Sequence, residues 1–290
     1  FNDNPYYKEY DWNFVYSAEH VLGNRDDLTN YIDLVLNNED IYRVFVSYKD
    51  VYWYYSLNMN LIYNFQSVNT YDSTYSSSLN DLLLLYEFDN PTSWTWELKQ
   101  KDLIDFISVK YALVNDENEL PHDQFAIVGN FQGINIYENL NYRTIANNYN
   151  RVVPYEFAKK NYSTSLINEA IICYEDDYFD IEEYDSDTNL YEAYDIVQNH
   201  NSLKFKINSD SKTFVVVSIP YDKGWEVRVD SMKTEIYKVN GGFMGFGIKS
   251  NGIHNIEMTF IPYGLKEGAF LSLASLFIFV GLVLREELFK

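Results

Sequence analysis

The sequence predicts an α+β fold in which an N-terminal α/β unit is followed by an antiparallel β-sandwich and one C-terminal transmembrane helix. Helical and strand patterns alternate before Pro154, short alternating segments separated by turns follow Tyr191, and residues 268–284 carry no charge. The expected parts are a mixed α/β extracytoplasmic domain at 1–174, an acidic linker at 175–190, a jelly-roll-like β-sandwich domain at 191–263, a transmembrane helix at 264–284 and a cytoplasmic tail at 285–290.

The N-terminal unit switches between two kinds of spacing. In several segments apolar residues recur every three or four positions, which predicts helices. These segments are 24–36, 76–88, 96–107 and 155–174. Elsewhere β-branched and aromatic residues dominate short runs, which predicts strands. The expected strands are 43–48, 54–68, 110–115, 125–130 and 134–138.

The run Glu175–Asp187 (EDDYFDIEEYDSD) is rich in carboxylates, which is typical of a solvent-exposed connection between domains. An EF-hand loop beginning at Asp185 would need Gly at its sixth position and Glu at its twelfth. Leu190 and Ile196 occupy those positions, so a calcium loop of this kind is excluded. We expect a solvated linker.

The next part alternates apolar and polar residues in short segments, which predicts strands with one solvent-exposed face. The expected strands are 191–198, 203–207, 214–219, 225–229, 235–239, 243–248 and 256–260. The pairs Asn240-Gly241 and Asn251-Gly252 supply the positive φ angles of tight hairpins. Pro220 and Pro262 close strands because proline cannot donate a ladder hydrogen bond. Short antiparallel strands at regular spacing are typical of a β-sandwich.

The stretch 268–284 (GAFLSLASLFIFVGLVL) is uncharged and is followed at once by Arg285. At about 1.5 Å per residue it spans about 25 Å as a helix, which is close to the thickness of a bilayer core. A buried helix of a soluble protein usually keeps a polar stripe, whereas this stretch is apolar on every face. We therefore expect a membrane anchor, with only Gly264–Glu267 as a tether to the sandwich.

Charge and composition limit the function. The net charge of −21 arises before the apolar helix and disfavours nucleic-acid binding. The single cysteine, Cys173, follows apolar residues, so we expect a buried, inert thiol. The four histidines are scattered, and we expect no metal site and no cofactor; His254 is expected to be a half-exposed strand side chain. The 43 Asp and Glu residues are too numerous to single out a catalytic pair, so no catalytic residue is assigned.

Aromatic residues make up 18% of the chain, and aromatic faces can stack on sugars. The densest aromatic cluster is Tyr52–Tyr55, and a polar run follows an expected strand near Tyr71. The candidate substrate-binding residues are Trp53, Tyr54, Tyr71, Asp72 and Ser73. The alternative is that these aromatic side chains fill a core or an interface.

The C-terminal third carries several short motifs in a fixed order. They are a Pro-Tyr-x-x-Gly-Trp segment, an Asn-Gly-Gly-Phe turn, a Gly-x-His strand leading to Pro, and a last apolar helix. The residues are Pro220, Tyr221, Gly224, Trp225, Asn240, Gly241, Gly242, Phe243, Gly252, His254 and Pro262. In this pattern the chain resembles the end of bacterial YfhO-like membrane proteins. Weaker matches lie upstream, at Tyr42-Arg43-Val44, Tyr71–Thr74, Val109–Val114 and Ile136–Asn139.

This resemblance implies a large polytopic protein similar to GT-C glycosyltransferases, which move sugars from polyprenyl phosphate to cell-envelope polymers such as teichoic acids. The chain, which starts at Phe1, would be an outward-facing, non-catalytic fragment in the bacterial cell membrane. The implied partners are the bilayer, the missing transmembrane helices of the same protein and a glycan polymer or polyprenyl-linked sugar. The alternatives are a membrane-anchored surface glycan-binding module without enzymatic activity, and a tail-anchored cytosolic scaffold.

Overall fold

The computed structural model describes residues 41–46, 66–67, 78, 101–114, 120, 123–131, 134–149, 151–161, 170–184 and 189–288. These residues contain three sheets and one long C-terminal helix. The helix expected at 24–36 and most of the one expected at 76–88 lie outside this part of the chain.

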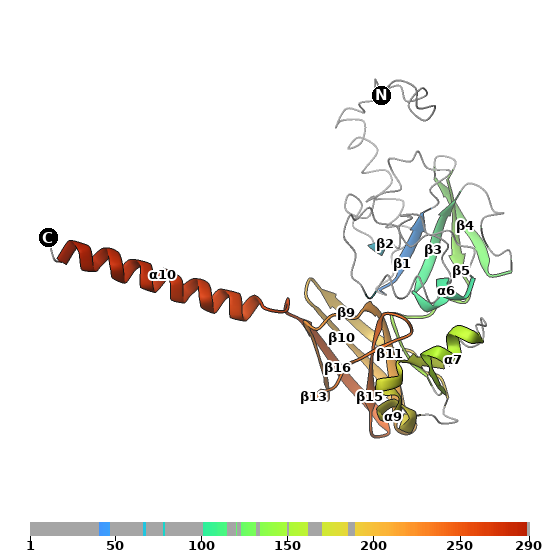
Figure 1. Cartoon of the computed structure of the whole chain (residues 1–290). Coiled ribbons are helices and arrows are strands. Elements are labelled where there is room, and N and C mark those ends of the chain that lie inside the picture. The colour runs from blue at the N-terminus through green and yellow to red at the C-terminus, as the bar shows by residue number, and fades with distance from the viewer. Residues whose placement is uncertain are drawn as a thin grey trace, which may run out of the picture.

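The first sheet is the N-terminal unit. It contains β1 (Arg43–Val46), β2 (Gln66–Ser67), β3 (Val109–Val114), β4 (Phe125–Phe131) and β5 (Ile134–Asn139), with α6 (Lys101–Phe106) before β3. The strand order is β2-β1-β3-β5-β4; β1 is parallel to β2 and β3, whereas β3, β5 and β4 pair antiparallel. Figure 1 shows this sheet at one end of the body, beyond the sandwich. Together with the sandwich, this mixed unit confirms the α+β fold class.

Two further sheets form the sandwich. One has the order β13-β12-β16-β10-β9, and the other has the order β6-β11-β15-β14-β8-β7. Their strands are β6 (Ala146–Tyr149), β7 (Arg151–Pro154), β8 (Ala170–Cys173), β9 (Tyr194–Asn199), β10 (Ser202–Ser209), β11 (Thr213–Pro220), β12 (Trp225–Val229), β13 (Met232–Thr234), β14 (Tyr237–Val239), β15 (Phe243–Ile248) and β16 (Gly252–Phe260). We call the sandwich sheet β13-β12-β16-β10-β9 the five-stranded sheet and the other one the six-stranded sheet. All strand pairs in this five-stranded sheet are antiparallel, as expected from the alternating pattern.

The six-stranded sheet is buried on both faces. Its inner face packs against the five-stranded sheet through Leu203, Phe205, Ile207, Val215, Val217, Met244, Phe246, Ile256 and Met258. Its other face packs against α6, β3 and the residues after β8 through Ile104, Phe106, Ile107, Ile181, Tyr184, Phe214, Val216 and Phe243. Consequently β11 is apolar along most of its length, as strands covered on both sides are.

The helix expected at 155–174 is wrong at its C-terminal end. Among the described residues of that range, 155–161 and 170–174, α7 (Tyr155–Lys160) is helical, whereas β8 is a strand whose four residues are all buried. It pairs parallel to β7 and meets β14 where Cys173 lies opposite Val239. The run Ala170–Cys173 is apolar because β8 lies inside the six-stranded sheet, and the Cys173 thiol is buried, as expected.

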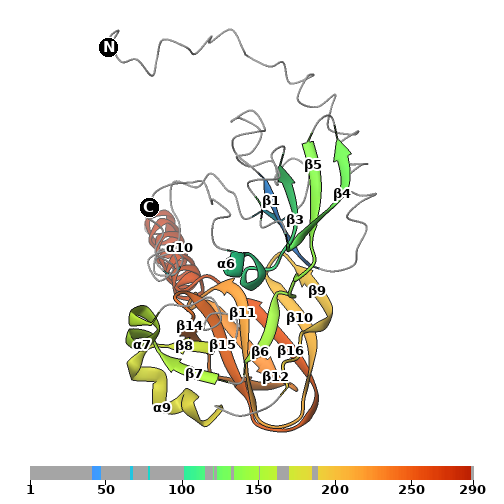
Figure 2. The same cartoon turned by 90° about the vertical axis from the view of Figure 1, so that its right-hand side faces the viewer.

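The acidic segment also differs from the expected exposed linker. Residues 175–184 form three short helical turns: η3 (Glu175–Asp177), α9 (Tyr178–Ile181) and η4 (Glu182–Tyr184). Ile181 and Tyr184 are buried in the core while Asp176 and Glu183 face solvent. Figure 2 shows α7 and α9 beside β7 and β8 at one side of the sandwich. Because β6, β7 and β8 belong to the sandwich sheet, that sheet extends across the domain boundary expected at 174.

Arg43 joins the N-terminal sheet to the sandwich. Its Nη1 donates to the Ile107 carbonyl oxygen at 2.7 Å and to Ser218 Oγ at 3.0 Å, and its Nη2 donates to the Ser218 carbonyl oxygen at 2.7 Å. Burial lowers the pKa of this guanidinium to about 10, and Tyr142 acts in the opposite direction. The group therefore stays charged near neutral pH and donates from β1 to β11, two strands of different sheets.

The tight turns are partly those expected. Asn240 and Gly241 have φ angles of 50° and 78°, and Gly252 has 114°, as the Asn-Gly pairs predict. A further hairpin joins β12 to β13 through Asp230 and Ser231, whose φ angles are 48° and 71°. No glycine marks this turn, and β13 was accordingly absent from the expected strands.

His254 fixes the Asp230 turn from inside the sheet. Its Nδ1 lies 2.7 Å from Asp230 Oδ2, its Nε2 lies 3.0 Å from the Ser250 carbonyl oxygen, and the backbone N–H of Asn255 donates to Asp230 Oδ1 at 2.9 Å. The side chain is only 4% exposed, whereas a half-exposed one was expected. Both ring nitrogens face oxygen atoms, which is why this polar ring can be buried.

We expect Asp230→Asn to remove a pH-dependent part of the stability. The hydrogen bond from His254, and then the one from Asn255, lowers the pKa of Asp230 below its ordinary 3.8. A lowered carboxyl pKa contributes stability that is fully present above the unfolded value and is lost as pH falls through the folded value. Asn tolerates positive φ, so the turn persists. Chemical unfolding should show that the wild type has a larger free energy of unfolding than the variant near neutral pH, and that this difference shrinks in strong acid. A difference that does not depend on pH would contradict the lowered pKa of Asp230.

Candidate functional site

The junction between the sandwich and α10 (Leu265–Leu288) is short and hydrogen-bonded. The Ile261 N–H donates to the Gly224 carbonyl oxygen at 2.9 Å, and the Leu265 N–H donates to that of Pro262 at 3.0 Å. Gly264, with a φ of 81°, turns the chain directly into the helix. The helix thus begins one residue after Gly264, and the tether is shorter than the expected Gly264–Glu267.

The helix itself extends away from the body (Figure 1). Residues 265–285 are apolar and long enough to cross a membrane, and none of that window is buried by the described protein. Phe270 and Phe277, for example, are 70% and 74% exposed. Apolar side chains exposed on every face are stable only against lipid or other helices. The described chain therefore ends in a membrane helix attached to a β-sandwich.

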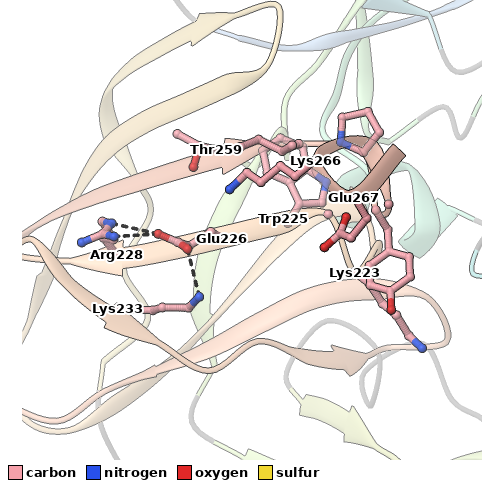
Figure 3. Close-up of a pocket in the computed structure, with 13 residues that line it drawn as sticks. Lys223, Trp225, Glu226, Arg228, Lys233, Thr259, Lys266 and Glu267 are labelled. Carbon is pink, nitrogen blue, oxygen red and sulfur yellow. Dashed lines mark hydrogen bonds and ion pairs between the residues drawn. The ribbon is translucent and has the colours of Figure 1, made fainter. Parts of the chain in front are cut away.

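A pocket of about 430 Å³ lies at this junction, where β12, β16 and the first turn of α10 meet (Figure 3). It is lined by Lys223, Gly224, Trp225, Glu226, Arg228, Lys233, Thr259, Ile261, Pro262, Tyr263, Gly264, Lys266 and Glu267. We call it the junction pocket. The first turn of α10 forms one wall, so the pocket lies at the start of the apolar helix, where a bilayer that holds this helix would meet water.

One end of the junction pocket holds an ion-pair group on the outer face of the five-stranded sheet. Glu226 Oε1 lies 2.8 Å from Arg228 Nη2, and Glu226 Oε2 lies 2.9 Å from Lys233 Nζ. Hydrogen bonds from Lys233 and Arg228 lower the pKa of Glu226. Such exposed pairs contribute little stability. As a consequence, Glu226, the carboxylate that the described residues supply at this end of the pocket, is already ion-paired with two cations.

Two further lysines of the junction pocket have no such partners. Within the part of the chain that the structure describes, neither Lys223 nor Lys266 forms an ion pair. Figure 3 shows Lys266 and Glu267 beside Trp225, with the Lys266 amine on the side of the Glu226 group and Lys223 on the opposite side of the pocket. Four basic side chains and two carboxylates line the pocket, whereas the whole chain carries a net charge of −21. The junction pocket is therefore a local exception to an acidic surface.

Two aromatic residues complete the junction pocket. Trp225 is half-buried, with its ring centroid 5.2 Å from that of Phe260, and Tyr263 is 83% exposed beside the start of α10. Trp and Tyr favour the membrane–water interface because each combines an apolar ring with a polar group. Their positions agree with an interfacial depth for the pocket.

A second hollow, of about 730 Å³, lies at the far end of the sandwich between α9, η4, β13 and the end of β15. Its carboxylates are those of Asp180, Glu183, Asp230 and Glu235. Burial, with a further contribution from neighbouring carboxylates, raises the pKa of the nearby Asp177. Among the described residues no group of three His, Cys, Asp or Glu side chains is arranged to hold a metal. We therefore treat the junction pocket as the candidate site.

The candidate substrate-binding residues from the sequence, Trp53, Tyr54, Tyr71, Asp72 and Ser73, all lie outside the described residues. Their assignment stays a prediction. The structure points instead to the lysines around the Gly224-Trp225 turn, which the sequence marked only as a turn. The available signal was the single lysine that follows each Ile-Pro-Tyr tripeptide, Lys223 after Pro220 and Lys266 after Pro262.

The fold and junction define a membrane-attached β-sandwich protein. Residues 178–272 match the family model described as "Bacterial membrane protein YfhO". Over 117 residues the chain is 29% identical to "Uncharacterized protein YfhO" of Bacillus subtilis (strain 168), a match that covers 40% of this chain and 14% of that relative. No solved structure matches. The matched part is YfhO-like, which confirms the resemblance seen in the sequence.

Proposed function

We propose that this chain is the extracytoplasmic, non-catalytic part of a polytopic bacterial membrane protein of the GT-C glycosyltransferase type. In this proposal its body positions a lipid-linked sugar donor or an envelope polymer, such as teichoic acid, beside a reaction centre formed by membrane helices outside this sequence. The single observation that carries the proposal is the junction. The sandwich passes into an exposed apolar helix without a flexible linker, so it is held directly at the membrane surface.

Two further observations support this role. The match covers 14% of the Bacillus subtilis relative, which leaves room in that protein for membrane segments outside the matched part. In addition, the described carboxylates of the junction pocket are engaged or exposed: Glu226 is paired with Arg228 and Lys233, and Glu267 lies on the first turn of α10. Neither is arranged as one of two facing carboxylates in a closed site, as acid-base chemistry on sugars requires.

We expect the chain alone, reconstituted in nanodiscs, to give no sugar transfer from polyprenyl-phosphate sugars to envelope polymer. The control is a membrane preparation containing the full-length relative, assayed with the same donor and acceptor. Turnover by the chain alone would contradict the non-catalytic assignment. Protease added to intact cells tests the orientation, because only an outward body is digested.

A membrane-anchored glycan-binding module without enzymatic activity is the second candidate. The half-buried Trp225 at the junction pocket favours it, since an accessible indole face can stack on a sugar. A glycan array separates the two functions. Binding of free glycans by the chain, lost in Trp225→Ala, would favour the module over a positioning role that needs the missing helices.

A further inference from the structure

We infer that the junction pocket binds the phosphate of an anionic phospholipid headgroup and thereby fixes the sandwich at one depth and orientation on the bilayer. This inference rests on the proposed function only for the placement of α10 in the membrane. It adds a ligand, a lipid phosphate, and assigns the ligand to Lys223 and Lys266.

Charge supports this ligand. A phosphate diester needs cationic donors that are not already neutralised, and Lys223 and Lys266 form no ion pair within the described residues. Arg228 and Lys233 also line the pocket and are positively charged, although both are ion-paired with Glu226. A free anion in bulk water would meet the repulsion of a body with a net charge of −21. A lipid phosphate avoids that repulsion because the bilayer already holds it at the junction.

Geometry supports the same ligand. Lys266 stands on the first turn of α10, and Lys223 stands on the loop before β12, so the two lysines approach the pocket from the membrane helix and from the sandwich. The hydrogen bond from Ile261 to Gly224 ties the loop before β12 to the short segment that leads from β16 into α10. Figure 3 shows the two side chains on opposite sides of the pocket, so a headgroup phosphate seated between them would be attracted both to the helix and to the sandwich. Exposed Tyr263 and half-buried Trp225 flank the same position.

The strand register provides matched control residues. Thr213 pairs with Ile248 at one end of the sandwich, while Pro220 pairs with Phe243 at the other end, close to the junction. Lys212 and Lys249 therefore lie at the end of the sandwich far from α10. Both are exposed, so the double variant Lys212→Gln/Lys249→Gln removes the same charge as Lys223→Gln/Lys266→Gln at a distance from the pocket.

The test uses the full chain in nanodiscs made of phosphatidylcholine with a minority of phosphatidylglycerol. Native mass spectrometry then measures which lipid is retained. We expect the wild-type chain to retain phosphatidylglycerol preferentially, and we expect this preference to fall about five-fold for each pocket lysine removed, or roughly 25-fold in the double variant. The Lys212→Gln/Lys249→Gln control should keep the wild-type preference.

Three outcomes would overturn the inference. One is the absence of any headgroup preference, and another is an equal loss in the control variant. The third is displacement of phosphatidylglycerol by inorganic phosphate or by polyprenyl phosphate, which would indicate a free-anion or a carrier-lipid site. Flotation of the chain with pure phosphatidylcholine vesicles tests the placement of α10 separately. A chain that floats but shows no preference loses only this inference, whereas a chain that fails to float also contradicts the proposed function.

Discussion

Replacing Gly224 with Ala is expected to destabilise the chain by about 3 kcal/mol and to disrupt the junction first. An added Cβ would lie 2.4 Å from the Ile261 carbonyl oxygen and 2.7 Å from Phe260 Cε2. Backbone cannot rotate away as a side chain can, so the chain must shift at Ile261, directly after β16. That shift would break the hydrogen bond from Ile261 to the Gly224 carbonyl, which fixes the segment that leads into α10.

The measurement is thermal unfolding of the full chain in nanodiscs, where a loss of this size lowers the midpoint by roughly 10 °C. Hydrogen exchange at Ile261 reports the junction itself. Gly268→Ala is the matched control, because nothing lies within 4 Å of its added Cβ and Ala favours a helix over Gly. Equal midpoints for the two variants would show that the Gly224 contact does not constrain the junction.

Four strands of the sheet β13-β12-β16-β10-β9, all except β13, could be predicted from the sequence because this sheet has one solvent-exposed face. Along β10 buried Leu203, Phe205 and Ile207 alternate with more exposed residues, and the period of two is visible in the sequence. Along β8 it is not. Because that strand is covered on both sides, its residues form a continuous apolar run that cannot be told from a buried helical segment by spacing alone.

The acidic segment shows how composition can hide a pattern. Carboxylates dominate 175–187, and this composition favoured an exposed linker. Ile181 and Tyr184 are nevertheless three residues apart, on successive helical turns, and both reach the core. Two well-placed apolar residues outweigh several charges that remain in water, since only the buried side chains gain free energy from packing.

The junction pocket could not be predicted for a different reason. Lys223 and Lys233 flank one hairpin and Lys266 stands on the helix, so their proximity depends on the register of β12, β13 and β16. Sequence spacing does not give that register when the turn between β12 and β13 has no glycine to mark it. The resemblance to the YfhO family identified the surrounding turns, and the three-dimensional arrangement of the lysines came only from the structure.

Arg43→Ala is expected to cost about 3 kcal/mol and to loosen the N-terminal sheet from the sandwich. The change leaves the carbonyl oxygens of Ile107 and Ser218 without the guanidinium that donates to both. Arg43→Lys should be intermediate, because a single ammonium on a different stem does not reproduce the planar fork that donates to both carbonyls. The measurements are the free energy of unfolding of the wild type and both variants, and amide hydrogen exchange in β3 and β11.

The control for Arg43 is Arg151→Ala, since Arg151 is exposed at the edge strand β7 and its loss should change stability by less than about 0.5 kcal/mol. Through Ser108, the loss of Arg43 is expected to affect residues beyond the two carbonyl groups. Ser108 Oγ lies 3.1 Å from Ser218 Oγ, and the Arg43 N–H donates to the Ser108 carbonyl oxygen at 2.8 Å. Losing the Arg43 side chain should therefore raise exchange in both β3 and β11, the strands of the two sheets that lie next to it. Equal stability of Arg43→Ala and Arg151→Ala would mean that packing of α6 and Phe243, rather than this guanidinium, joins the two units.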